Sequence, residues 1–320
     1  MMRKILFTLL LLMPILAGAD TINPQTGRKP AIKHVIYITL DGVRWQDIYN
    51  THRFLPTFWK DYAKNAAIYG EPGSTTTMEV ASVPISLPSY QSQMTGIVTA
   101  CRENECGGLA VETFAEALVK KAGFKKSEVA SISCWEVMDN AFESRLGTAF
   151  SNHGTRPMHD PDTYEIDPIM KQLNIEQAAA YPGDDTRSDK YTLAQALHYF
   201  EKYKPKFLWI SFGDADDLAH EGKLEEYHQT LFFYDRAIDK IMKMVKTLNL
   251  KGETMIIITT DHGRGNGNNW TEHDETMPEA KQTWAFVLNG KLQNGIADGN
   301  FYHYSTLSIR PTIEKAFGIK

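Results

Sequence analysis

The chain has 320 residues, a formal net charge of −5 and a hydrophobic share of 42%. That share is ordinary for a globular protein and is enough for one large α/β domain or two small ones. Because the charge balance is acidic and no basic stripe occurs, duplex nucleic acid is excluded as the expected partner. Composition indicates nothing about the oligomeric state.

The first segment has the composition of a secretory signal peptide. Arg3 and Lys4 precede an apolar run, and the small residues 17–19 offer a cleavage site. The run is short for a membrane span, and no cysteine follows it to take a lipid anchor. We expect cleavage after residue 19, a polar lead over residues 20–32, and a periplasmic or secreted protein without a stable membrane anchor. An uncleaved anchor is the alternative.

From residue 33 onward, apolar strand-like runs alternate with helical stretches, and no internal repeat occurs. Near-continuous hydrophobic runs predict strands that are buried on both faces, as in parallel sheets covered by helices. The predicted strands are 34–40, 128–133, 207–212, 255–258 and 284–288. The predicted helices are 111–121, 193–203, a long helix with the core stripe Leu231, Tyr234, Ile238, Ile241 and Val245, and a terminal helix from Ile309. We therefore predict a single α/β domain over residues 33–320, with a mostly parallel central sheet and helices on both faces.

The stretch 135–189 breaks this alternation, being polar and rich in His, Asp and Pro. We interpret it as an excursion on the substrate side, because such loops often cap a site and set its specificity. A solvated excursion without a role is an equal alternative. A third metal ion held by His159 or Asp162 is a minor one.

Metal-ligand side chains follow three of the predicted strands. They are Asp41 after the first strand, Asp216 and His220 after 207–212, and Asp261 and His262 after 255–258, with His273 able to return through a short loop. Since the carboxyl ends of parallel strands meet at one edge of a sheet, these side chains should converge there. A lone Asp after a strand is usually a cap or turn residue. Three such strand ends favour a site for two divalent metal ions.

An ordered set of motifs carries a family resemblance. Asp41-Gly42 ends the first strand, and Ser86-Leu87-Pro88-Ser89-Tyr90 precedes a helix that ends in Thr95-Gly96. An Asp-x-x-x-His motif, an Asp-His-Gly motif and a late His follow. This order resembles the alkaline phosphatase superfamily, and most of all its nucleotide pyrophosphatase/phosphodiesterase branch. The resemblance covers about residues 33–320.

The resemblance implies roles for single residues. Asp41, Asp261 and His262 would bind one metal ion, and Asp216, His220 and His273 would bind the other. Ser86 would be the nucleophile and would also bind a metal ion, and Asn104 would donate to a phosphoryl oxygen. Zn²⁺ is the expected ion from the affinity order, with Mn²⁺ as the alternative.

The expected substrate is a small phosphate ester, hydrolysed through a phosphoseryl intermediate. Ser86 stands at a predicted helix start, where backbone N–H groups would also favour an anion. Serine before a helix is commonly only an N-cap, and Ser89 is the rival nucleophile.

Differences from the motifs of related families exclude some activities. Sulfatases of the superfamily require an Arg where Tyr90 stands, and the related phosphoglycerate mutases carry a large inserted domain for which this chain has little room. Arg264 and Arg102 are candidate clamps for the extra charge of a phosphomonoester. The preference between monoesters and diesters therefore stays open.

The cysteines fit an exported protein. Cys101 and Cys106 could form a disulfide that fixes the loop carrying Asn104, and Cys134 is expected to be a buried free thiol. Two alternatives to an enzyme remain: a degenerate relative that binds a phosphate ligand without turnover, and a structural envelope protein that binds no metal.

Overall fold

A computed structural model describes residues 31–180, 185–294 and 304–319 of the chain. The expected signal peptide and nearly all of the expected lead lie outside these residues. Within the described ranges, no helix combines the length and apolar character that crossing a membrane requires.

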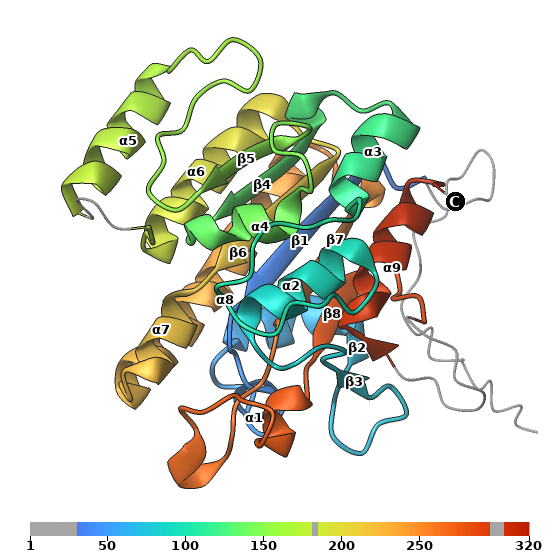
Figure 1. Ribbon diagram of the computed structural model, residues 1–320, viewed down its shortest axis with the longest axis vertical. Coiled ribbons are helices and arrows are strands. Elements are labelled where there is room, and N and C mark those ends of the chain that lie inside the picture. Colours follow the sequence, from blue (N-terminus) through green and yellow to red (C-terminus); the bar gives the residue numbers. More distant parts are fainter. Residues whose placement is uncertain (1–30, 181–184, 295–303, 320) are drawn as a thin grey trace, which may run out of the picture. The chain divides into compact units, whose positions relative to one another are not determined.

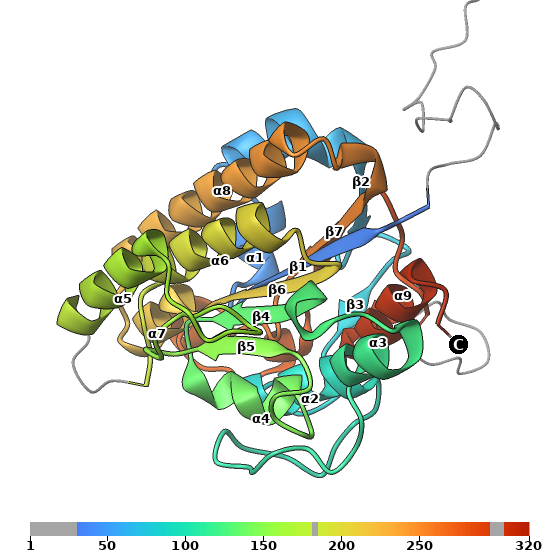
Figure 2. The ribbon, with the colours of Figure 1, turned by 90° about the horizontal axis from the view of Figure 1, so that it is seen from above.

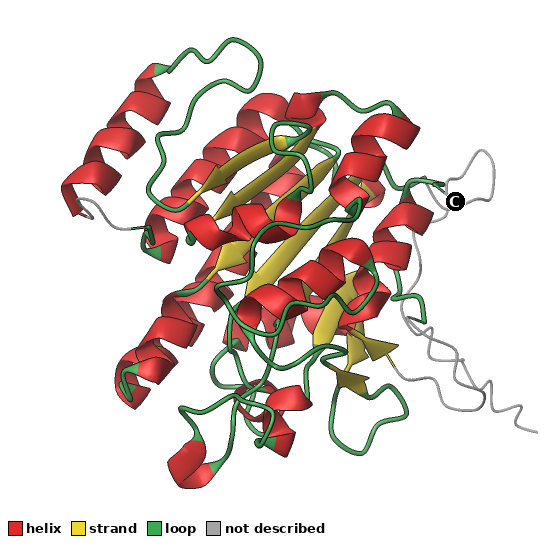
Figure 3. Cartoon of the chain, in the orientation of Figure 1, coloured by secondary structure: helices red, strands yellow, loops and turns green. Residues whose placement is uncertain are grey.

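Seven strands form the central sheet (Figures 1 and 3). In spatial order they are β2 (Ala66–Tyr69), β8 (Ala285–Leu288), β7 (Thr254–Thr259), β1 (His34–Leu40), β6 (Phe207–Phe212), β4 (Val129–Ser133) and β5 (Phe150–His153). β1 pairs in parallel with β6 and β7, and β4 pairs in parallel with β5 and β6. Only β8 runs against its neighbours β7 and β2. The predicted mostly parallel sheet is therefore confirmed.

Helices cover both faces of this sheet, as Figure 2 shows for α5, α6 and α8 on one side and α2, α3, α4 and α9 on the other. The helices packed with the first face are α1 (Trp45–Tyr49), α5 (Pro168–Ala180), α6 (Asp189–Tyr203), α7 (Asp214–His220) and α8 (Leu224–Thr247). Those on the second face are α2 (Ser86–Thr95), α3 (Phe114–Ala122), α4 (Asp139–Phe142) and α9 (Ile309–Ala316).

The strands bury both of their faces because their side chains alternate between two hydrophobic clusters. Ile36 and Ile38 of β1 pack under the first set of helices, and Val35 and Tyr37 pack under the second. The predicted stripe of α8 is fully buried in the first cluster, which explains the position of this long helix. Cys134 is a buried free cysteine, as predicted.

Short elements complete the described chain. They are the two-stranded sheet of β3 (Met78–Glu79) and β9 (Tyr304–Ser305), the π-helical turn η1 (Phe58–Tyr62), and the 3₁₀ turns η2 (Ala63–Asn65), η3 (Lys126–Glu128), η4 (Glu136–Met138), η5 (Lys251–Glu253), η6 (Gly267–Asn269), η7 (Pro278–Lys281) and η8 (Thr306–Ser308).

The stretch 135–189 differs from the expected excursion, because it contributes α4, the edge strand β5 and α5. β5 is polar, and its side chains find specific partners. His153 hydrogen-bonds Ser131 Oγ and Asp139 Oδ1, each at 2.8 Å, and Asn152 Oδ1 accepts from the buried Arg187 at 2.6 Å. An edge strand pairs on one side only, so it needs no apolar run that sequence patterns would reveal.

Candidate metal centre and nucleophile

The sheet topology brings three strand ends side by side. Because β6 and β7 flank β1 and run parallel to it, the residues after these strands share one edge. The N–H of Asp41 donates to the carbonyl of Phe212 at 3.0 Å, and the N–H of Gly42 donates to Asp261 Oδ1 at 3.1 Å. The end of β1 is thereby hydrogen-bonded to the ends of both neighbouring strands.

The six candidate ligands form two groups of three. One ligand atom from each of Asp41, Asp261 and His262 lies within 4.8 Å of the others, and the same holds for Asp216, His220 and His273. In the described part of the chain these are the only groups of this kind. The first group is buried, whereas the second includes the exposed His220.

The two groups adjoin each other. The rings of His262 and His273 stack with centroids 4.0 Å apart and planes 5° apart. In the second group, His220 Nε2 lies 3.0 Å from Asp216 Oδ2 and 3.1 Å from His273 Nε2. His273 Nδ1 donates to the carbonyl of Pro84 at 2.8 Å, which leaves Nε2 as the atom free to bind a metal.

The donor set fits cations. Asp261 Oδ2 is buried and has no hydrogen-bond partner, and it lies 3.3 Å from Nε2 of His262 in the same group. Buried carboxylates that stay unpaired are costly unless a cation compensates them. Oxygen and imidazole ligands in groups of three are those that Zn²⁺ and Mn²⁺ accept.

Burial disfavours the charged form of four of the candidate ligands. Burial and the nearby Asp216 raise the pKa of Asp261 to about 6. Burial, followed by the charges of Asp261 and Asp216, raises the pKa of Asp41 well above its usual range. Burial lowers the pKa of His262 to about 4 and, together with His262, lowers that of His273 to about 3. A neutral imidazole is the form of histidine that binds a metal ion. Carboxylates held close together attract metal cations.

Ser86 is the first residue of α2, and its side chain points into the first group. Its Oγ lies 3.3 Å from His262 Nε2 and 3.4 Å from Asp41 Oδ1. Ser89, the rival nucleophile, is buried as Ser86 is, but its hydroxyl donates to the carbonyl of Asp261 at 2.7 Å and not to a candidate ligand atom. The geometry therefore favours Ser86 over Ser89 as the nucleophile.

The start of α2 offers an anion fewer N–H groups than expected. The N–H of Leu87 donates to Asn104 Oδ1 at 3.0 Å, Pro88 has no N–H, and the N–H of Ser89 donates to Ile85 at 3.0 Å. These three positions are therefore unavailable to a phosphate, and the expected contribution of the helix end is wrong for them.

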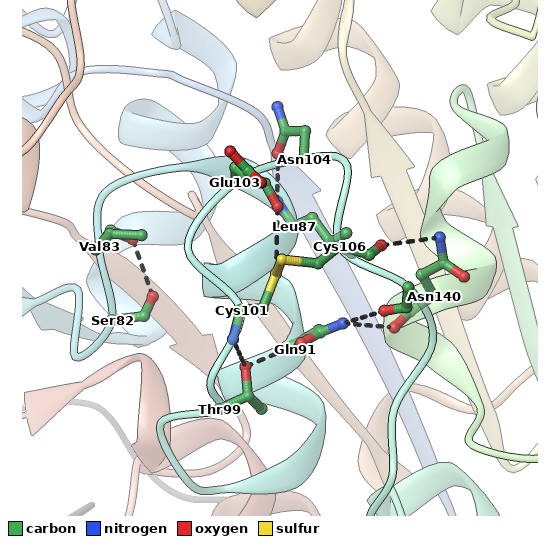
Figure 4. Close-up of a disulfide and its surroundings, with 11 residues drawn as sticks. Ser82, Val83, Leu87, Gln91, Thr99, Cys101, Glu103, Asn104, Cys106 and Asn140 are labelled. Atoms are coloured by element: carbon green, nitrogen blue, oxygen red, sulfur yellow. Dashed lines mark hydrogen bonds between the residues drawn. A yellow bond between two sulfur atoms is a disulfide. The ribbon is translucent and has the colours of Figure 1, made fainter.

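Asn104 lies beside the second group. It lines a pocket of 280 Å³ with Ile85, Glu103, Glu105, His220, Glu272, His273 and Asp274. The predicted Cys101–Cys106 disulfide is present and closes the turn that carries Asn104 (Figure 4). Four of the eight pocket residues are acidic, so the wall around Asn104 is negatively charged.

Neither candidate arginine is placed as a phosphate clamp. Arg264 is fully buried, and it donates to the carboxylate and the carbonyl of Asp216 and to the carbonyl of Thr271. Arg102 is exposed and forms an ion pair with Glu275. Both guanidinium groups therefore have protein partners, and the buried Nε of Arg264 has no hydrogen-bond partner among the described residues.

One residue of the site was missed by sequence reasoning. The hydroxyl of the buried Tyr90 donates to Asp41 Oδ2 at 3.1 Å and so orients this carboxylate. Tyr90 follows Ser86 by four residues on α2, a spacing that places both side chains on one helix face. This spacing from Ser86 could have indicated from the sequence that Tyr90 belongs to the site.

Comparisons with known proteins identify the family of the chain. Residues 35–312 match the family model described as type I phosphodiesterase / nucleotide pyrophosphatase. A 2,3-bisphosphoglycerate-independent phosphoglycerate mutase of Gracilaria tenuistipitata var. liui is 21% identical over 154 residues, which are 48% of this chain and 26% of the mutase. The chain thus aligns with only about a quarter of that relative's length.

Solved structures share the fold at low identity. A 2-O GAG sulfatase superposes with TM-score 0.60 and 14% identity, over 92% of this chain and 71% of the sulfatase. The alkaline phosphatase of the Antarctic bacterium TAB5 superposes with TM-score 0.53 and 14% identity, over 92% of this chain and all (100%) of the phosphatase. A mutant of that phosphatase with Mg bound superposes with TM-score 0.51. The predicted alkaline-phosphatase-like fold is confirmed.

Proposed function

Because the chain belongs to the type I phosphodiesterase / nucleotide pyrophosphatase family, we propose that it is an exported phosphodiesterase that uses two divalent metal ions. One observation carries the proposal: Ser86 Oγ lies within 3.4 Å of Asp41 and His262, at the edge where two Asp/His groups meet. A hydroxyl in such surroundings suits nucleophilic attack on a phosphate ester.

The metal ions, Zn²⁺ or Mn²⁺, would be held by Asp41, Asp261 and His262 and by Asp216, His220 and His273. When bound, they would supply Lewis-acid stabilisation of the attacking and leaving oxygens. The unpartnered Asp261 Oδ2 supports this assignment.

The chain's own residues would perform the following steps. Ser86 Oγ forms a bond to phosphorus while the bond to the leaving oxygen breaks, and the proton of the Ser86 hydroxyl ends on that oxygen, giving a phosphoseryl intermediate and an alcohol. The Nδ2 group of Asn104 donates to a non-bridging phosphoryl oxygen. Water then attacks phosphorus and displaces Ser86 Oγ, which takes up a proton from that water, so a phosphomonoester is released and the Ser86 hydroxyl is restored.

Diesters are the better substrates on electrostatic grounds. A monoester dianion needs more cationic contacts than a diester monoanion, and Arg264 and Arg102 both have other partners. The four acids of the pocket would repel a second negative charge further. Oxidation of Cys101 and Cys106, together with the composition of residues 1–19, supports export.

The decisive experiment compares initial rates on a bis-aryl phosphate, the matched aryl phosphate and the matched aryl sulfate, with metal content measured in the same preparation. We expect the diester to be hydrolysed fastest. In Ser86→Ala we expect turnover to fall at least ~10³-fold with metal content unchanged. Full activity in Ser86→Ala would refute the nucleophile, absence of turnover on all esters would indicate a degenerate relative, and absence of metal would indicate an envelope protein.

A further inference from the structure

The loop between α2 and α3, residues 96–113, has no helix or strand, yet it holds Asn104 at the first turn of α2. Asn104 Oδ1 accepts the N–H of Leu87 at 3.0 Å. Since only the amide oxygen can accept from an N–H, the orientation of this side chain is defined, and Nδ2 points away from Leu87 (Figure 4). Asn104 lines the pocket with His220 and His273, so its free donor belongs to the proposed active site.

Gln91 anchors this loop from α2. It is 2% exposed, and it lies one turn beyond Leu87 on the same helix. Its Nε2 donates to the carbonyls of Gly107 at 3.2 Å and Asn140 at 3.0 Å, and its Oε1 accepts from Thr99 Oγ1 at 2.9 Å. A single buried amide thus holds the loop both before and after Asn104.

The disulfide lies inside the two anchor points. Cys101 and Cys106 close a turn around Asn104, and the N–H of Cys101 donates to Thr99 Oγ1 at 3.3 Å. Gln91, Thr99 and the disulfide therefore form one connected support, which Figure 4 shows beneath Asn104. Without Gln91 the disulfide would still close the turn but would not fix its position on α2.

We propose that Gln91 is a positioning residue that acts through Asn104, holding its amide donor where a phosphoryl oxygen binds. The inference rests on the proposed function, because it concerns the same reaction. A shift of about 1 Å in a catalytic donor is enough to lower turnover ~10²-fold. A chain that hydrolyses esters without using Asn104 would have no such dependence on Gln91.

A double-mutant cycle tests this directly, with kcat and KM measured on the bis-aryl phosphate. We expect Asn104→Ala to lower kcat ~10²–10³-fold and Gln91→Met to lower it ~10–10²-fold in the otherwise wild-type chain. In the Asn104→Ala background, Gln91→Met should lower kcat less than ~3-fold, because the group it positions is already gone. An equal loss in both backgrounds would overturn the proposal.

Gln93→Met is the matched control. Gln93 lies on the same helix and is fully buried, but it bonds Tyr37 and Ser89 and not the loop. Whatever factor Gln93→Met costs in the wild-type chain should recur in the Asn104→Ala background. If the effect of Gln93→Met on kcat also differed between the two backgrounds, Asn104→Ala would be perturbing the whole helix.

Hydrogen exchange separates this inference from the proposed function, because it needs no turnover. In full-length protein, Gln91→Met should raise exchange at least ~10-fold across residues 97–113, whereas Gln93→Met should leave that segment unchanged. Unchanged exchange in Gln91→Met would overturn the positioning role even if the enzyme proves to be a phosphodiesterase. Failure of the proposed function would appear instead as full activity in Ser86→Ala.

Discussion

Arg264 donates to both the side chain and the main-chain carbonyl of Asp216, and it is fully buried while doing so. It also donates to the carbonyl of Thr271, two residues before His273. One guanidinium therefore connects the helix that carries Asp216 and His220 to the loop that carries His273. Although burial opposes it, Arg264 is the main reason that the pKa of Asp216 lies well below its usual range.

The first prediction is that Arg264→Met destabilises the metal-free protein by about 3–5 kcal/mol, since it leaves the buried Asp216 without its cationic partner. Urea unfolding at neutral pH measures the change. Arg236 on α8 is exposed, so Arg236→Met should stay within ~0.5 kcal/mol of the wild type. Similar values for the two variants would show that Arg264 has no special structural role.

The second prediction concerns Gly42, which has φ +62° and lies against the second ligand group. A Cβ at Gly42 would lie 2.1 Å from Asp216 Oδ1, so Gly42→Ala must displace that carboxylate. Gly73 also has a left-handed φ of +76° but has open space around it. Gly73→Ala should cost only the backbone strain, about 1–2 kcal/mol, and should keep full metal content.

We expect Gly42→Ala to cost more than Gly73→Ala and to lose metal from the second group. Urea unfolding and elemental analysis of purified protein measure the two effects. Equal destabilisation with equal metal content in the two variants would contradict the close approach of Gly42 to Asp216.

The third prediction concerns metal removal. If cations bind the folded state only, a metal concentration ~10³ times Kd stabilises the protein by about 4 kcal/mol. Dialysis against a chelator should therefore lower Tm, and adding Zn²⁺ or Mn²⁺ back should restore it. Asp261→Asn should bind less metal, and its Tm should change less when metal is removed or added back. The exposed Asp162→Asn should bind metal and change in Tm as the wild type does. A Tm that changes neither with the chelator nor with added metal would exclude the metal centre.

The fourth prediction is a pH dependence of stability that comes from Glu143, outside the site. Burial raises the pKa of Glu143 to about 7, although the N–H groups of Ala149 and Gly147 donate to it. The folded state therefore keeps a proton that the unfolded chain loses near the ordinary glutamate pKa of 4.5. The stability that this proton contributes is present below that value and is lost as the pH rises to about 7.

We expect the wild type to lose roughly 1–3 kcal/mol more than Glu143→Gln between about pH 4.5 and pH 7.5. Urea unfolding at several pH values in this window gives the difference. The exposed Glu165→Gln should reproduce the wild-type pH dependence. Parallel curves for the wild type and Glu143→Gln would show that Glu143 ionises normally in the folded protein.

The sequence by itself determined the central strands and the residue types at their ends. β1 and β6 begin and end where their apolar runs do, and β7 extends the predicted run by one residue at each end. The reason is that strands buried on both faces need continuous hydrophobic stretches, and that chain direction places their carboxyl ends at one edge. Convergence of the six Asp and His side chains followed from local pattern and this general rule.

Only the tertiary structure decided which polar group each side chain meets. Arg264 binds Asp216, 48 residues away, and Gln91 binds the carbonyl of Asn140, 49 residues away. The polar edge strand β5 likewise depends on partners distant in the chain. A hydrophobic pattern records burial but not hydrogen-bond partners, because polar side chains choose among donors and acceptors that only folding brings within reach.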